Sequence, residues 1–181
     1  MSDEDVRKTC NFDVCCMCKT ICCQDAKPPL TKKRQKIIED YLKTQKLQID
    51  KPFSHESYSF PSVDKLGFCV FYDKDTGKCM VHPVKPETCK AGPVTFDINC
   101  KTGKVEWYLK KTLICAFAGT LYADGVSFKE HFMAAREELR CLICELDAEA
   151  LRAILKIEEP QTFKIGEEAL PKGVSDKLFS Q

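Results

Sequence analysis

The residues of this chain with the clearest chemical potential are its 13 cysteines. Six of them gather near the start of the sequence: Cys10, Cys15, Cys16, Cys18, Cys22 and Cys23. A C-x2-C spacing lets a tight turn present two sulfurs to one metal centre, and backbone amides of the turn can donate hydrogen bonds to the thiolates. Small buried thiols are the alternative, but these six follow neither helical nor strand periodicity. The segment therefore predicts metal binding.

Three more cysteines lie in the middle of the sequence, each beside a glycine or proline turn signal. Cys69 and Cys79 fall within two expected strands, where both side chains could point toward one end of a small sheet. Cys89 follows Pro86, a residue favoured in the first turn of a helix, and the helix dipole there would favour its thiolate. Any one of the three could be a core cysteine, but together they indicate a second group of ligands.

The expected compartment decides between metal binding and disulfides. The first residues, MSDEDVRKTC, are acidic and polar, unlike a secretory signal. No apolar run approaches the roughly 20 residues that a membrane-spanning helix needs. We therefore expect a cytoplasmic protein without a membrane partner. Clustered cysteines in a reducing cytoplasm more often bind metal than form disulfides, with hyperthermophile proteins as the exception.

The charge balance argues against a nucleic-acid partner. The chain has 28 basic and 27 acidic residues, so no whole-molecule field favours an anionic polymer. A basic run between Lys32 and Lys36 lacks interleaved aromatic residues, and we interpret it as the solvated face of a helix.

The pattern around the cysteines predicts an α+β fold, with a small antiparallel sheet, flanking helices and a cysteine-rich N-terminal loop organised by metal. Thr31 is expected to cap a helix that ends near Lys46. Two hairpins are expected after it, one around the turn at 73–77 and one around the turn at 100–103.

A helical region is expected in the last third of the chain. Ser127 and Glu130 match a capping box, and apolar side chains from 128 to 146 recur at helical spacing. Asp147 is expected to cap a further helix, which should stop before Pro160.

These elements predict a simple domain organisation. Residues 1–160 form one cysteine-cluster metal-binding domain, with the core motif region at 15–95 and the helical part at 111–160. Residues 161–181, which contain Gly166, Pro171 and Gly173, are expected to form a loosely structured tail.

Two cysteines on the expected long helix do not fit its apolar stripe. Cys141 and Cys144 lie about 60° apart at 100° per residue, on the face opposite Leu139. One hypothesis is that they serve a second metal centre or a protein partner. The alternative is a helix that is buried on both faces, because apolar stripes are imperfect.

The order of the cysteine motifs resembles a known family. The block of Cys15, Cys18, Cys22 and Cys23 is followed by G-x-C-x-F at Cys69, C-x-V-H at Cys79 and P-E-T-C-K at Cys89. This succession is similar to the YkgJ-type cysteine-cluster family, a zinc- or iron-chelating domain with a CxxCxxCC signature. The resemblance covers roughly residues 15–95. It implies one set of metal ligands: Cys15, Cys18, Cys22, Cys23, Cys69, Cys79 and Cys89.

The chain departs from that family pattern in two places. Lys19-Thr20-Ile21 separates Cys18 from the cysteine pair, where the family usually has a glycine and one other residue. Lys85 and Lys90 stand where arginines are common in the family. The resemblance also extends to a domain of flagellin lysine methylases whose cysteines bind an iron–sulfur cluster, which implies that a four-iron cluster is plausible here.

The donor set favours iron–sulfur over zinc. Both accept four thiolates, but zinc often recruits histidine, and of His55, His82 and His131 only His82 lies beside a cysteine motif. We therefore expect an iron–sulfur centre of the [4Fe–4S] type, with zinc as the alternative cofactor. The expected role is redox chemistry or metal-assisted group transfer. The alternatives are a structural zinc module that binds a protein partner and a metal-delivery protein. No pattern identifies a catalytic residue.

Overall fold

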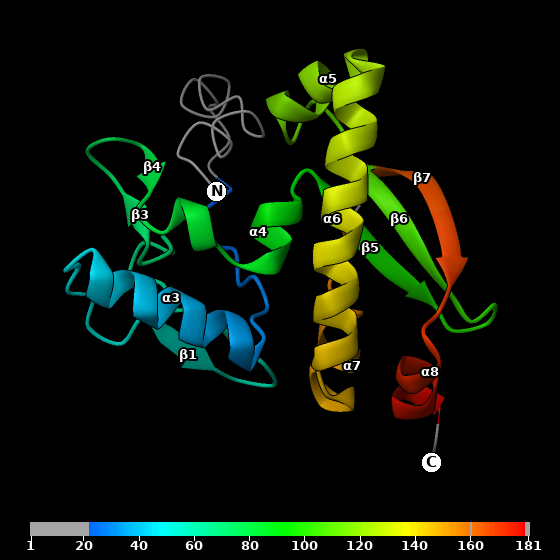
Figure 1. Ribbon diagram of the computed structural model, residues 1–181, viewed down its shortest axis with the longest axis horizontal. Coiled ribbons are helices and arrows are strands. Elements are labelled where there is room, and N and C mark those ends of the chain that lie inside the picture. The colour runs from blue at the N-terminus through cyan, green and yellow to red at the C-terminus, as the bar shows by residue number, and fades with distance from the viewer. Residues whose placement is uncertain (1–21, 160, 180–181) are drawn as a thin grey trace. The chain divides into compact units, whose positions relative to one another are not determined.

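The computed structural model describes residues 22–159 and 161–179 of the chain (Figure 1). Cys10, Cys15, Cys16 and Cys18, and with them the expected N-terminal loop, lie outside the described residues. Helices combine with small antiparallel sheets, which confirms the α+β class. The chain divides into two compact units, Met1–Pro86 and Glu87–Gln181. Each unit is described by itself.

From residue 22 onward, the described part of the first unit has one α-helix, four very short strands and a single-turn 3-10 helix. In chain order its elements are α3 (Lys32–Thr44), β1 (Phe53–His55), β2 (Ser59–Pro61), β3 (Tyr72–Asp73), β4 (Lys78–Cys79) and the single-turn 3-10 helix η1 (His82–Val84). β1 pairs with β2 and β3 pairs with β4, both antiparallel. The expected hairpin around 73–77 is confirmed, although its paired strands are shorter than the sequence runs that predicted it.

Helix α3 begins where the sequence indicates. The Thr31 hydroxyl accepts a hydrogen bond from the Arg34 amide at 3.0 Å, so the N-cap satisfies one of the amides left open at a helix start. Ile38 and Leu42 are buried on one side of the helix. They belong to the small core of this unit, whose buried members are Leu30, Ile38, Leu42, Phe71 and Val81.

The second unit is built from longer elements. They are α4 (Glu87–Ala91), β5 (Val94–Asn99), β6 (Lys104–Lys110), α5 (Ala116–Ala123), α6 (Gly125–Glu145), α7 (Ala148–Ile154), β7 (Thr162–Ala169) and α8 (Lys172–Phe179). The three strands form an antiparallel sheet in the order β5-β6-β7. This confirms the second expected hairpin, which is made by β5 and β6.

Alternation along β6 explains how this sheet packs. Val105, Trp107 and Leu109 are buried, and the residues between them are only partly covered, as expected for a strand with one face on a core. Helix α6 contacts β5 (Figure 1) and buries Leu139 and Leu142 along one stripe.

The expected N-cap of the long helix in this unit needs correction. Helix α6 begins at Gly125, and its N-cap is Asp124, whose carboxylate accepts from the Val126 and Ser127 amides. Ser127 instead donates its hydroxyl hydrogen to Asp124 at 2.6 Å, so the capping box at Ser127 is wrong. Asp competes successfully because an ionised carboxylate is a stronger acceptor near the helix dipole than a hydroxyl. The expected cap at Asp147 is confirmed by its bond to the Ala150 amide.

The C-terminal segment is also more ordered than expected. Residues 162–169 form β7 along the edge of the sheet, and residues 172–179 form α8. The β7 sequence TFKIGEEA lacks a strong apolar alternation, so the pattern did not indicate a strand. Ion pairs across to β6 help to hold it there, among them Lys164 with Glu106 at 2.8 Å.

In the part of the chain that the structure describes, none of the helices has the combination of length and apolar composition that is needed to cross a bilayer.

Candidate metal centre

Backbone hydrogen bonds tie the end of the N-terminal cysteine segment to the strand-like segment around Cys69. The Cys69 amide donates to the Cys23 carbonyl at 2.8 Å, and the Asp25 amide donates to the Gly67 carbonyl at 2.9 Å. Gln24 and Phe68 form an antiparallel bridge between these two bonds. Cysteines more than 40 residues apart in sequence therefore lie on two directly paired segments.

The turn that makes this pairing possible needs a glycine. Gly67 has φ +81°, a left-handed conformation that costs roughly 1–2 kcal/mol for a residue with a side chain. A Cβ atom at this position would lie 2.1 Å from the Asp25 carboxylate oxygen and 3.5 Å from the Asp25 amide nitrogen. The bare glycine thus allows residues 24 and 25 to approach the turn closely.

Asp64 shapes the same turn from the other side. Its carboxylate accepts hydrogen bonds from the Leu66 amide at 2.8 Å and the Phe68 amide at 2.9 Å. Its second oxygen pairs with the Lys74 ammonium at 2.6 Å, and that ammonium, followed by the Phe68 amide bond, lowers the pKa of Asp64. Our interpretation of the sequence missed this residue, although an Asp two positions before a Leu-Gly turn is a typical signal for such side-chain turns.

The β3–β4 hairpin connects the segments that contain Cys69 and Cys79. Cys79 is in β4 opposite Tyr72 in β3, and the Tyr72 amide donates to the Cys69 carbonyl at 2.9 Å. Both cysteines are half-buried. The unit's core lies beside them, because Phe71 follows Cys69 by two residues and Cys69 and Cys79 both pack against that core.

Three of the expected ligands influence one another's ionisation. Burial, opposed by a hydrogen bond from the Phe71 amide and assisted by the Cys79 and Cys22 thiols, raises the pKa of the Cys69 thiol to about 11. Burial also raises the pKa of Cys79, with another upward contribution from Cys22. Cys22, Cys69 and Cys79 therefore lie close enough for each thiolate to disfavour the next. A metal cation would remove that repulsion, because thiolate ligands bind it in their charged form.

The described residues hold only part of the expected ligand set. Cys15 and Cys18 lie outside them, and Cys89 lies on α4 in the second unit. Within residues 22–159 and 161–179, no group of three or more His, Cys, Asp or Glu side chains is arranged so that it could hold a metal ion. Cys22 and Cys23 are in a turn, with Cys22 exposed and Cys23 half-buried. The prediction that all seven cysteines are ligands stays a prediction.

The described cysteines outside that set lie in the second unit. Cys100 is exposed in the β5–β6 turn, and Cys115 is half-buried just before α5. Cys141 and Cys144 are both exposed on α6, away from the buried stripe that contains Leu139. The alternative of a helix buried on both faces is therefore wrong at these two positions.

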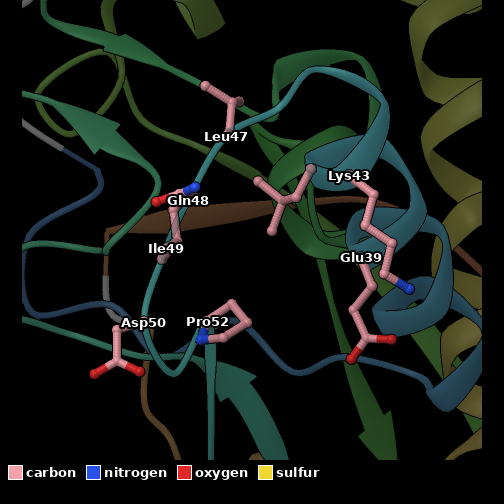
Figure 2. Close-up of a pocket in the computed structure, with 8 residues that line it drawn as sticks. Glu39, Lys43, Leu47, Gln48, Ile49, Asp50 and Pro52 are labelled. Carbon is pink, nitrogen blue, oxygen red and sulfur yellow. The ribbon is translucent and has the colours of Figure 1, made fainter.

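The first unit has a surface pocket whose lining contains no cysteine. It has a volume of about 810 Å³ and is formed by the end of α3 and the loop after it. Figure 2 shows Glu39 on the helix and Asp50 on the loop, separated in this view by Pro52. Its lining residues are Glu39, Leu42, Lys43, Leu47, Gln48, Ile49, Asp50 and Pro52. Because no cysteine lines this pocket, it is not part of the candidate thiolate site.

Comparison with known proteins decides the family. The family described as "CxxCxxCC: Putative zinc- or iron-chelating domain" matches residues 14–118, more than half of the 181-residue chain. The chain belongs to the CxxCxxCC family. This confirms the resemblance found in the sequence and supports metal binding by the chain. The family description covers zinc and iron alike.

One relative is also similar to this chain. An uncharacterised protein of Methanocaldococcus jannaschii is 30% identical over 127 residues, which is 66% of this chain and 65% of that protein. The match therefore spans slightly less than two thirds of the relative. No solved structure matches the chain.

Proposed function

We propose that the first unit holds an iron–sulfur centre of the [4Fe–4S] type and uses it for redox chemistry or metal-assisted group transfer. Cys22, Cys69 and Cys79 are the proposed ligands among the described residues. The family resemblance implies that the remaining thiolates come from Cys15, Cys18, Cys23 and Cys89. When bound, the cluster would supply an electron acceptor or a Lewis-acidic iron.

The observation that carries this proposal is the backbone pairing of two distant cysteine-bearing segments. The Cys69 amide donates to the Cys23 carbonyl, and Cys79 lies in the hairpin that follows Cys69. Holding several of these cysteines as thiolates in a half-buried place is unfavourable without a cation. A metal centre gives this arrangement a physical reason, and metal binding then contributes to folding because the ligands converge only in the folded chain.

The preference for iron–sulfur follows from the donors. His82 is the only histidine beside one of these cysteine motifs, and its Nε2 atom meets the Lys85 ammonium at 3.3 Å. A lysine ammonium can only donate, so the Nε2 lone pair is used within the protein. The remaining donors are sulfur, which suits an iron–sulfur cluster well.

Exposure supports a role in transferring electrons or groups. Cys22 is exposed, while Cys69 and Cys79 are half-buried. A centre held by these ligands would have one edge near solvent and one edge against the core. Such an edge gives a partner protein or a small substrate access to the centre, as redox and group-transfer chemistry both require.

Anaerobic metal analysis of freshly purified full-length protein tests the proposal. We expect iron and acid-labile sulfide in equal amounts, about four of each per chain, and a brown absorbance that dithionite bleaches. The Cys69→Ser/Cys79→Ser double variant should lose both, and Cys144→Ser, a matched substitution at an exposed position on α6, should keep both. A colourless protein with stoichiometric zinc would overturn the iron–sulfur assignment. A protein without any bound metal would overturn the metal centre itself.

A further inference from the structure

Two cysteines of the second unit share an exposed face of its long helix. Cys141 and Cys144 lie near the C-terminal end of α6, and both are exposed. Leu142 and Ile143, which stand between them, are fully buried and occupy the opposite side of the helix. Cysteine is among the residue types most often found buried. Two exposed thiols within one helical turn therefore need a chemical reason, because packing does not supply one.

Helix geometry fixes the spacing of this pair. Side chains three residues apart lie on the same face, with Cβ atoms about 5–6 Å apart, and both lean toward the helix N-terminus. A disulfide needs Cβ atoms about 3.5–4.5 Å apart, so that bond would unwind the helix locally. An ion with two metal–sulfur bonds of about 2.3 Å holds its sulfurs at most about 4.6 Å apart. Cys141 and Cys144 can span that distance with the helix intact, so the pair is suited to share an ion.

The number of donors selects the ion. Glu137 and Glu145 lie four residues before and four residues after Cys141 on the same helix. In the part of the chain that the structure describes, however, no group of three or more His, Cys, Asp or Glu side chains could hold a metal ion. Zinc normally takes four ligands. Two thiolates without a third protein donor suit a soft monovalent ion, and Cu(I) is the biological ion that thiolates select in this way.

A lysine compensates the charge at this end of the helix. The C-terminal end of a helix has a partial negative charge, which disfavours thiolates nearby. Lys177 of α8 places its ammonium at that end, where it donates to the Leu146 carbonyl at 3.0 Å and to the Cys144 carbonyl. Its positive charge offsets the helix end and the single negative charge that remains when Cu(I) binds two thiolates.

We propose that Cys141 and Cys144 form a Cu(I) site in which the ion bridges the two thiolates on one face of α6. Each thiol releases its proton when the ion binds, and the copper stays in the +1 state. All of these residues belong to the second unit, and the site shares no ligand with the iron–sulfur centre proposed above. The inference therefore does not depend on that centre.

Cu(I) titration of the full-length protein under anaerobic conditions tests the proposal, with bicinchoninate as a competing chromophoric chelator. Cysteines elsewhere in the chain also bind Cu(I), so the measured quantity is the difference between variants. The Cys141→Ser/Cys144→Ser double variant should bind one Cu(I) fewer per chain than wild type. Each single variant should weaken binding at this site by about 100- to 10,000-fold, the usual gain from presenting two ligands together. Cys100→Ser, which changes an exposed cysteine in the β5–β6 turn, should bind as much Cu(I) as wild type.

Thiol alkylation locates the ion in the chain. Without copper, iodoacetamide should modify Cys141 and Cys144, because both are exposed. With Cu(I) buffered at a concentration that saturates the wild-type protein, both should be protected, as peptide mass spectrometry would show. Far-UV circular dichroism should be unchanged by copper and by the serine substitutions, because the helix stays intact.

The outcomes separate this inference from the proposed function. Equal Cu(I) binding by wild type and the double variant, or alkylation of both cysteines at Cu(I) saturation, would overturn the inference. One ion per two chains, with a dimer on size-exclusion chromatography, would also overturn it, because the ion would then be shared between copies. Iron and sulfide contents, measured in the same samples, should not differ among these proteins. A wild-type protein without iron would overturn the proposed iron–sulfur centre and leave the copper site standing.

Discussion

The two units of this protein differ in the size of their regular elements and of their apolar cores. The second unit has a three-stranded sheet and the long helix α6, and its buried residues include Trp107, Leu139 and Ile143. In the described part of the first unit, the strands have only two or three residues and the hydrophobic core cluster has five buried members. Long helices and multi-stranded sheets, as in the second unit, form many internal hydrogen bonds and bury apolar faces, whereas short strands do not form stable sheets alone.

That difference explains where the expected ligands are. Four of the five described cysteines in the expected ligand set, Cys22, Cys23, Cys69 and Cys79, lie in the first unit, whose described part has the less regular structure, and the fifth, Cys89, lies in the second unit. Small or loop-rich segments commonly rely on disulfides or metal to supplement a small core. The comparison suggests that metal binding stabilises the first unit and that apolar packing stabilises the second. Each prediction below tests one side of this contrast.

Metal removal should have the largest effect, and it should act on one unit. Chelation under anaerobic conditions should expose the amides of the first unit to hydrogen exchange, including those of Cys69 and Tyr72, because the bound metal contributes folding free energy there. Peptides from β6 and α6 should keep their protection. Hydrogen-exchange mass spectrometry of the metal-bound and apo forms measures this. Equal loss of protection in both units would contradict the contrast.

A core truncation in the second unit should give the opposite result. Trp107 is 1% exposed, and Trp107→Ala should lower the free energy of unfolding by about 3–5 kcal/mol. The amount of metal bound per chain should not change. Chemical denaturation followed by far-UV circular dichroism, together with metal analysis, checks both parts.

Trp107→Phe is the matched control for that truncation. The Trp107 Nε1 atom is buried and has no hydrogen-bond acceptor among the described residues. Phenylalanine removes this donor and keeps most of the apolar volume, so it should cost much less than alanine. A cost as large as that of alanine would mean that the indole nitrogen has a partner.

The second unit was also easier to predict from the sequence. Its hairpin alternates apolar and polar residues over β6, and Asp147 has a clear capping position, so local pattern and tertiary packing agree there. β7 was missed because its place in the sheet depends on ion pairs between Lys164 and Glu106 and on pairing with a strand more than 50 residues away. Single-sequence patterns do not contain such long-range information.

The family was predictable from the sequence, but the arrangement of the candidate site was not. Motif order indicated the cysteines, and three of them are electrostatically coupled neighbours in the structure. The turn that positions them was not predicted, because it depends on Asp64 and Gly67 and on backbone bonds to residues 23 and 25. The contact between the Lys85 ammonium and the His82 imidazole was also not predicted, because only the folded chain places the two side chains together.

A pair of glycine substitutions gives a smaller and sharper test of the contrast. Gly67→Ala and Gly103→Ala both place a side chain at positive φ, +81° and +65°, so each should cost about 1–2 kcal/mol. A Cβ atom at Gly103 meets no atom within 4 Å, whereas one at Gly67 meets Asp25. Gly67→Ala should therefore also weaken metal binding, and Gly103→Ala should not. Equal metal affinity in the two variants would argue against a role for the Gly67 turn in the centre.

Acidification should give the smallest effect in the second unit, from Glu106. The Lys164 ammonium, followed by the Tyr108 hydroxyl, lowers the pKa of Glu106 from 4.5 to about 2. A carboxyl whose pKa is lower in the folded than in the unfolded protein stabilises the fold above its unfolded value. This contribution should be present at neutral pH and should be lost as the pH falls from about 4.5 toward 2.

The first unit should respond to acid at higher pH. Metal-bound cysteines release the metal when protons compete for the thiolates, so metal loss should precede the loss of the Glu106 contribution. Thermal denaturation of wild type and Glu106→Gln between pH 7 and pH 3 measures that contribution as the difference between the two proteins, and metal release is followed in the same samples. The difference should shrink toward pH 3 because, below about pH 4.5, Glu106 is protonated in the unfolded chain while it is still ionised in the folded protein. A difference that is constant with pH would show that Glu106 acts through packing alone, and the ion pairs of β7 would then be incidental to the stability of the second unit.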